Sequence, residues 1–75
     1  MKGVMDFLKN LRKRRGKSQQ ELANALGMTR QTYARREAHP EELSIAEALV
    51  ICKVLEIDIE ELIDSVVQFV EQAGA

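Results

Sequence analysis

Several residue types that build reactive sites are scarce in this 75-residue sequence, and each shortage excludes a class of function. The single cysteine, Cys52, cannot form a disulfide within the chain, so nothing indicates an oxidising compartment. Together with the single histidine, His39, it provides too few soft ligands for a zinc site. No glycine-rich phosphate loop is present, and His39 lacks the neighbouring pattern that a hydrolytic triad needs. We therefore expect no metal, no cofactor and no enzymatic activity.

Long apolar segments are missing too. The longest apolar run, Ala48 to Cys52, is far short of a membrane span, and the N-terminus lacks the apolar stretch and cleavage site of a signal peptide. We expect a cytoplasmic protein with no membrane partner and no small-molecule ligand. The length predicts one small domain over residues 1–75.

The remaining composition favours an all-α fold. The sequence has one proline, Pro40, and no β-branched runs with period two, so strands are not expected. Aromatic residues make up only 4%, and the core must therefore come mainly from Leu, Ile, Val and Ala. The first of five predicted helices has Val4, Phe7, Leu8 and Leu11 on one face and ends near Arg15. The others cover, with their caps, residues 18–27, 29–37, 44–55 and 58–73.

Short motifs mark the helix boundaries. Three residue pairs have the spacing of a capping box, namely Ser18 with Glu21, Ser44 with Glu47, and Asp58 with Glu61. Gly16 and Gly27 follow predicted helices, where a left-handed residue commonly ends the helix. The segment 44–55 is apolar almost all round, as expected of the central helix of a small core.

Charge is divided unevenly along the chain. Residues 1–36 hold ten of the eleven Lys and Arg against two acids, a net charge of +8, whereas residues 37–75 hold one Lys against ten acids, a net charge of −9. The overall net charge of −1 conceals this division. Asymmetry between the halves of a chain indicates a charged partner, and the basic half is suited to nucleic acid.

The most informative segment is residues 19–37. A capped helix, a turn at 27–29 and a second capped helix form the helix-turn-helix pattern, whose second helix can lie in the DNA major groove. Arg30, Gln31 and Arg35 on the second helix can read bases, since Arg pairs with guanine and Gln with adenine. The alternative is a solvated helix face without that role. DNA is favoured by the basic residues of the first helix, which are suited to phosphates: Lys9, Arg12, Lys13, Arg14 and Arg15.

The sequence SQQELA at residues 18–23, followed by LGMTRQT at 26–32, resembles the Cro/C1-type helix-turn-helix family. These are the lambda-repressor-like DNA-binding domains of phage repressors and bacterial regulators. The resemblance spans roughly Phe7 to Ile63 and includes LEIDIEEL at 55–62, which is similar to the family's junction between its fourth and fifth helices. It implies a five-helix domain that binds operator DNA, usually as a two-fold dimer, in a bacterial cell or a phage-infected host.

The resemblance also implies roles for individual residues. Base contacts are expected from Arg30, Gln31 and Arg35, and phosphate contacts from Arg12, Lys17, Ser18, Gln19 and Thr29. Gln19 is expected to brace the recognition helix as well. Arg12 is expected to be partly structural, through an ion pair with Glu37 that ties the first helix to the end of the third.

Three positions depart from the family pattern: Tyr33, Arg36 and His39. Tyr33 replaces a branched aliphatic residue, and we expect it in the core with its hydroxyl at the edge, not on DNA. Arg36 is expected to lay its aliphatic stem over the core. Because His39 replaces a common glycine, we expect the third helix to end differently, in a helical turn stopped by Pro40. Cys52, on the apolar fourth helix, is expected to be a buried, unreactive thiol.

The last predicted helix has a wider apolar stripe than the core of one domain needs. We expect a homodimer interface formed by Val66, Val67, Phe69 and Val70. The surplus apolar face of the fourth helix is expected to join it through Val50, Ile51 and Val54. The alternative is a helix folded wholly onto its own core.

These observations predict a sequence-specific, double-stranded DNA-binding transcriptional regulator of the repressor or Cro kind, a homodimer that reads operator half-sites with helix 29–37. The alternative is a protein-interaction module, such as an antitoxin-like partner or an adaptor, built on the same fold. The salt dependence of DNA binding distinguishes the regulator from the interaction module, because binding through phosphate contacts weakens steeply as the salt concentration rises.

Overall fold

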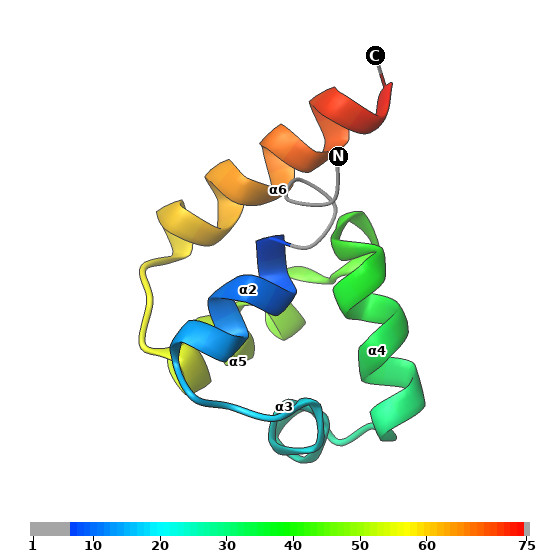
Figure 1. The fold of residues 1–75 in the computed structure, drawn as a ribbon, viewed down its shortest axis with the longest axis vertical. Helices are drawn as coiled ribbons and strands as arrows, with labels where there is room; N and C mark the ends of the chain where they lie inside the picture. Colours follow the sequence, from blue (N-terminus) through cyan, green and yellow to red (C-terminus); the bar gives the residue numbers. More distant parts are fainter. Residues whose placement is uncertain (1–6, 75) are drawn as a thin grey trace.

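Helices make up most of the described chain. The computed structural model describes residues 7–74, with the side chains of Phe69, Ala73 and Gly74 outside that description (Figure 1). The elements are α2 (Phe7–Arg14), α3 (Gln19–Leu26), α4 (Arg30–Ala38), the short 3₁₀-helix η1 (Pro40–Glu42), α5 (Ile45–Leu55) and α6 (Ile59–Gly74). No strand occurs among residues 7–74, so the prediction of an all-α fold with five helices is confirmed. Val4, expected on the first helix, lies outside the described residues.

Two capping boxes fix the starts of α3 and α5, as the spacing predicts. Ser18 Oγ accepts a hydrogen bond from the Glu21 N–H (3.0 Å), and the Glu21 carboxylate accepts one from the Ser18 N–H (2.8 Å). Ser44 and Glu47 repeat the arrangement at α5, with both distances at 3.0 Å. The backbone hydrogen bond from Ser18 lowers the pKa of Glu21 below its ordinary value. Each box satisfies two N–H groups that the first turn of a helix leaves without partners.

Left-handed residues end α3 and α5. Gly27 follows α3 with a φ of 70°, as predicted. Glu56 follows α5 with a φ of 57°, which the sequence does not indicate because the residue is not glycine. The third predicted capping box is wrong. The Glu61 N–H donates to the Asp58 carbonyl oxygen (3.1 Å), and no reciprocal side-chain bonds are found between these two described residues.

The end of α4 confirms the effect expected of His39. This residue has a φ of −131°, outside the left-handed region, and its N–H donates to the Arg35 carbonyl oxygen at 2.8 Å. The chain then turns directly into η1 at the buried Pro40. The helix therefore ends in a helical turn in place of a glycine, and this turn carries Glu41 and Glu42 beside the last turn of α4.

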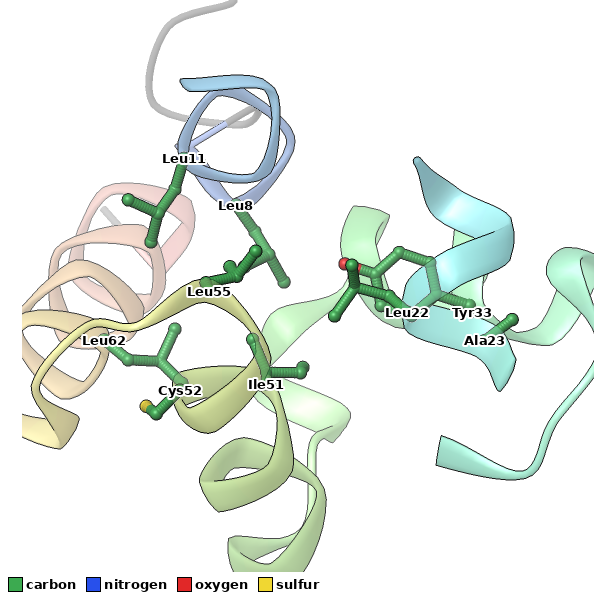
Figure 2. Close-up of a cluster of buried hydrophobic side chains, with 9 residues drawn as sticks. All are labelled: Leu8, Leu11, Leu22, Ala23, Tyr33, Ile51, Cys52, Leu55 and Leu62. Atoms are coloured by element: carbon green, nitrogen blue, oxygen red, sulfur yellow. The ribbon is translucent and has the colours of Figure 1, made fainter. Parts of the chain in front are cut away.

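All five α-helices contribute to one apolar core (Figure 2). Its buried side chains are Leu8 and Leu11 of α2, Leu22 and Ala23 of α3, Tyr33 of α4, Ile51, Cys52 and Leu55 of α5, and Leu62 of α6. The prediction that Tyr33 belongs to the core is confirmed, since the side chain is fully buried. The expected position of its hydroxyl at the edge of the core is wrong, because the hydroxyl is buried with the ring. Cys52 is buried as expected, and this burial raises the pKa of its thiol, which disfavours the reactive thiolate.

The rotation of α5 differs from the prediction. Ile51, expected on a surplus face, is fully buried, and Val54 packs against the core. The exposed apolar residues of α5 are instead Ile45 (81% exposed) and Leu49 (51%), while Val50 is half-buried. A helix that is apolar almost all round lacks a polar face from which its rotation can be read. The surplus apolar surface therefore lies near the N-terminal end of α5.

Candidate nucleic-acid interface

The helix pair α3–α4 has the geometry of a helix-turn-helix. Figure 1 shows α4 along one edge of the molecule, with α3 beside its N-terminal end. The buried Ala23 leaves room for the two helices to pack, and its carbonyl oxygen accepts from the Met28 N–H (3.0 Å) in the turn. Gly27 supplies the left-handed residue there, and Thr29 caps α4 by accepting from the Thr32 N–H (3.1 Å). The second helix is thus fixed on the first with one face open to solvent.

The open face of α4 holds the side chains expected to read bases. Arg30, Gln31 and Arg35 are all exposed, and Ala34 between them is half-buried. Arg30 and Gln31 lie in the first turn of α4, and Arg35 follows one turn later. Each of the three bears donors suited to base edges, and Gln31 bears an acceptor as well.

A chain of hydrogen bonds joins three helices behind this face. The Arg12 guanidinium of α2 binds the Glu37 carboxylate of α4 twice, from Nε (2.7 Å) and from Nη2 (3.2 Å). Its Nη1 donates to the Lys17 carbonyl oxygen (2.7 Å). Gln19 of α3 donates to the same carboxylate (3.1 Å) and accepts from Nη1 of Arg30 (3.0 Å). The expected ion pair and the bracing by Gln19 are thus both present in the structure.

Burial bears on the two roles expected of Arg12. Its side chain is 7% exposed, and its guanidinium is directed at Glu37 and at the backbone of Lys17. The structure thus supports the structural role of Arg12, while its contact with phosphate stays a prediction. Although burial alone would raise the pKa of Glu37, hydrogen bonds from Arg12 and Gln19 and the charge of Arg12 hold it below its ordinary value.

Tyr33 lies against this buried pair. Its hydroxyl is buried and has no hydrogen-bond partner among the described residues, so the side chain contributes through its ring. Burial, followed by the negative charge of Glu37, raises the pKa of Tyr33 far above its ordinary value. The phenol therefore stays neutral, and the residue does not reach the open face of α4.

Acidic residues outside α4 pair with its basic side chains. Glu42 of η1 binds Arg35 at 3.2 and 3.0 Å, and Glu47 of α5 binds the half-buried Arg36 at 3.3 Å. Neither pair was predicted from the sequence. The two consecutive acids after α4 were a visible signal, but their partners depend on the path of the turn that replaces the usual glycine.

One group of potential metal ligands occurs among the described residues. His39, Glu41 and Glu42 bring ligand atoms within 4.8 Å of one another. All three are exposed, His39 lies 3.4 Å from Glu41, and Glu42 is already bound to Arg35. We assign no metal site to them.

Four phosphate-binding candidates lie at the starts of α3 and α4. Ser18 and Thr29 are exposed caps at helix N-termini, where backbone N–H groups favour anions. Lys17 and Gln19 are half-buried, and Gln19 is bound to Arg30. The exposed basic residues of α2 and the turn after it add positive charge: Lys9, Lys13, Arg14 and Arg15.

The model of the helix-turn-helix family matches residues 8–62, well over half of the chain. This chain belongs to the Cro/C1-type helix-turn-helix family. Proteins of this family are DNA-binding regulators, and the match covers α2, α3, α4, η1, α5 and the first turn of α6. Most of α6 therefore lies beyond the segment that the family shares.

Comparisons with individual proteins do not narrow the assignment beyond the family. No curated protein and no solved structure matched the chain. Among the described helices, none combines the length and the apolar character needed to cross a membrane.

Proposed function

We propose that this Cro/C1-type protein is a transcriptional regulator that binds operator DNA sequence-specifically and reads it with α4. The observation that carries the proposal is the set of exposed base-reading side chains, Arg30, Gln31 and Arg35, on the second helix of the helix-turn-helix. Arg can donate twice to guanine O6 and N7, and Gln can bind adenine N6 and N7. Its action is occupancy of an operator in a bacterial cell or a phage-infected host.

The network behind α4 supports this proposal. Glu37, held by Arg12, binds Gln19, and Gln19 accepts from Arg30. This arrangement restrains Arg30 before DNA arrives, so less side-chain freedom is lost on binding. Gln19, Ser18, Thr29 and Lys17 are proposed to contact phosphates and fix the register of α4.

We also propose that the protein binds DNA as a homodimer. Five large apolar side chains are exposed near α6 and the start of α5: Ile45, Leu49, Ile63, Val67 and Val70. An apolar groove lined by Leu43, Ala48 and Val66 runs between these elements. Apolar surface of this extent commonly marks an interface. Of the interface expected from the sequence, Val67 and Val70 are about half exposed, Val66 packs against its own core, and the side chain of Phe69 lies outside the described residues.

Alanine variants at the open face test base reading. On the duplex that the wild-type protein selects from a random pool, Arg30→Ala and Gln31→Ala should each relax preference at one base pair, by about 1–3 kcal/mol. Lys53→Ala, which removes an exposed charge from the acidic half, is the control and should leave preference unchanged. Variants that weaken binding to every sequence equally would contradict base reading by α4. If the protein binds a protein partner and shows no preference among DNA sequences, the alternative of a protein-interaction module is favoured.

A further inference from the structure

Glu42 lies where it can control how Arg35 meets DNA. We propose that Glu42 is a positioning residue, which orients the Arg35 guanidinium for guanine and keeps it from binding phosphates indiscriminately. This inference rests on the proposed function and deepens it, because it adds a specificity-determining residue outside the helix-turn-helix.

The geometry of the pair leaves the base-reading edge of Arg35 open. Nε of Arg35 donates to Oε1 of Glu42 (3.2 Å) and Nη2 donates to Oε2 (3.0 Å), so the carboxylate covers the side of the guanidinium that carries Nε. A guanidinium has five N–H donors in one plane. The end formed by Nη1 and the outer hydrogen of Nη2 is not used in this pair. That end is a fork which matches guanine O6 and N7.

The carboxylate is held by a short, anchored segment. The Glu42 N–H donates to the His39 carbonyl oxygen (2.9 Å), and the Leu43 N–H donates to that of Pro40 (3.1 Å). Pro40 itself is buried. Because the backbone of η1 is fixed at both places, Glu42 restrains a long side chain that is 61% exposed and would otherwise sample many rotamers.

The charge of Glu42 also acts against unspecific binding. A free Arg at the DNA surface gains affinity for any phosphate, whatever the sequence. An Arg already neutralised by a carboxylate gains less from a phosphate, and a phosphate that approaches the pair is repelled by Glu42. Guanine is neutral and presents acceptors to the open fork, so the pair favours the base over the backbone.

Glu41 provides a matched control on the same turn. It is exposed, carries the same charge, and contacts His39 and not Arg35. Glu42→Gln and Glu41→Gln therefore remove equal charge from adjacent positions, and only the first loses the carboxylate that holds Arg35.

The experiment measures binding to the duplex selected by the wild-type protein and to its single-base-pair variants. Arg35→Ala first identifies the base pair that Arg35 reads. Glu42→Gln should lower the preference at that base pair roughly two- to five-fold and raise affinity for unrelated duplex, whereas Glu41→Gln should leave the preference intact. In the double variant Arg35→Ala/Glu42→Gln, the second substitution should cause no further loss of preference.

Two results overturn the inference while the proposed function stands: Glu42→Gln keeps the full preference, or Glu41→Gln loses as much. If the wild-type protein selects no consensus, or Arg35→Ala relaxes no base pair, reading by Arg35 is wrong and this inference falls with it.

Discussion

Glu37 connects the buried ion pair that holds α4 with Arg30, which we propose reads DNA. It is buried at the end of α4, accepts from Arg12 and Gln19, and through Gln19 is connected to Arg30 on the open face. Removal of one partner from a buried ion pair leaves the other charge uncompensated, which costs far more than the loss of a surface pair. We therefore expect this carboxylate to be the main electrostatic determinant of the position of α4 in the domain.

Glu37→Gln is expected to lower the free energy of unfolding by about 3–5 kcal/mol at neutral pH. Glu42→Gln, which breaks the exposed pair with Arg35, should cost no more than about 1 kcal/mol and serves as the control. Because the pKa of Glu37 is lowered in the folded protein, its contribution is present above the ordinary value of 4.5 and is lost as pH falls through the folded pKa. Urea unfolding of both variants and the wild type from pH 7 to pH 3 measures this.

Two results of that titration would contradict this role of Glu37. One is a similar loss of stability from Glu37→Gln and Glu42→Gln at neutral pH. The other is a stability difference between wild type and Glu37→Gln that does not shrink on acidification.

Two ion pairs of α4 differ in whether they could be predicted from the sequence. The Arg12–Glu37 pair was implied by a resemblance that fixes both positions in a shared fold. The Arg35–Glu42 pair was not, because it depends on a turn that this chain builds with His39 and Pro40 in place of the usual glycine.

Among the elements, those with explicit boundary signals were predicted best. Serine capping boxes and Gly27 placed α3 and α5 correctly, since each supplies a hydrogen bond or a backbone conformation that few other residues supply. The predicted rotation of α5 is wrong at Ile51, which is buried, because a uniformly apolar helix has no polar side from which its rotation can be identified. The left-handed Glu56 was not predicted, because the sequence has no glycine at the end of α5 to indicate this conformation.

The turn between α3 and α4 depends on the backbone conformation of Gly27. A Cβ at this position would meet nothing within 4 Å, so the cost of Gly27→Ala comes from the left-handed φ of 70° and not from a clash. We expect Gly27→Ala to lower stability by about 1–2 kcal/mol, measured by thermal unfolding. Gly27→Asn should cost less, since Asn tolerates this conformation better. Equal or higher stability of Gly27→Ala would mean that the turn does not need a left-handed residue.

The apolar side of α6 is the element proposed to pair two copies. Val67 is the most direct probe, because it is 47% exposed, whereas Val66 packs against its own core. Val67→Asp should convert a dimer to a monomer in sedimentation velocity and keep the helical circular dichroism of the wild type. Gln68→Asp places the same charge on an exposed neighbouring position and should remain dimeric. If the wild-type protein is a monomer, or if Val67→Asp remains a dimer, the apolar side of α6 does not form a dimer interface.

Across the whole molecule, the basic and the acidic residues lie mostly on different helices. The basic residues lie mostly on α2, on the turn after it and on α4, and the acidic residues mostly on η1, α5 and α6. If α4 reads DNA as proposed, positive charge on α2 and α4 orients the domain as it approaches DNA, and the acidic half disfavours other orientations. The net charge of −1 therefore does not argue against nucleic acid.

The size of the domain also bears on the dimer. Its extents of 34 × 24 × 22 Å suit one half-site, whereas half-sites one helical turn apart lie about 34 Å centre to centre. Two copies paired through α6 would present two α4 helices to such a site. The symmetry of the bound sequence thus reports on the assembly as well as on base reading.

Selection of the wild-type protein on a random duplex pool, at about 0.15 M salt, measures whether it reads duplex DNA sequence-specifically, as proposed for α4. We expect enrichment of a two-fold symmetric consensus with half-sites about one helical turn apart. Recovery of bound duplexes without any consensus at this salt concentration would contradict sequence-specific reading.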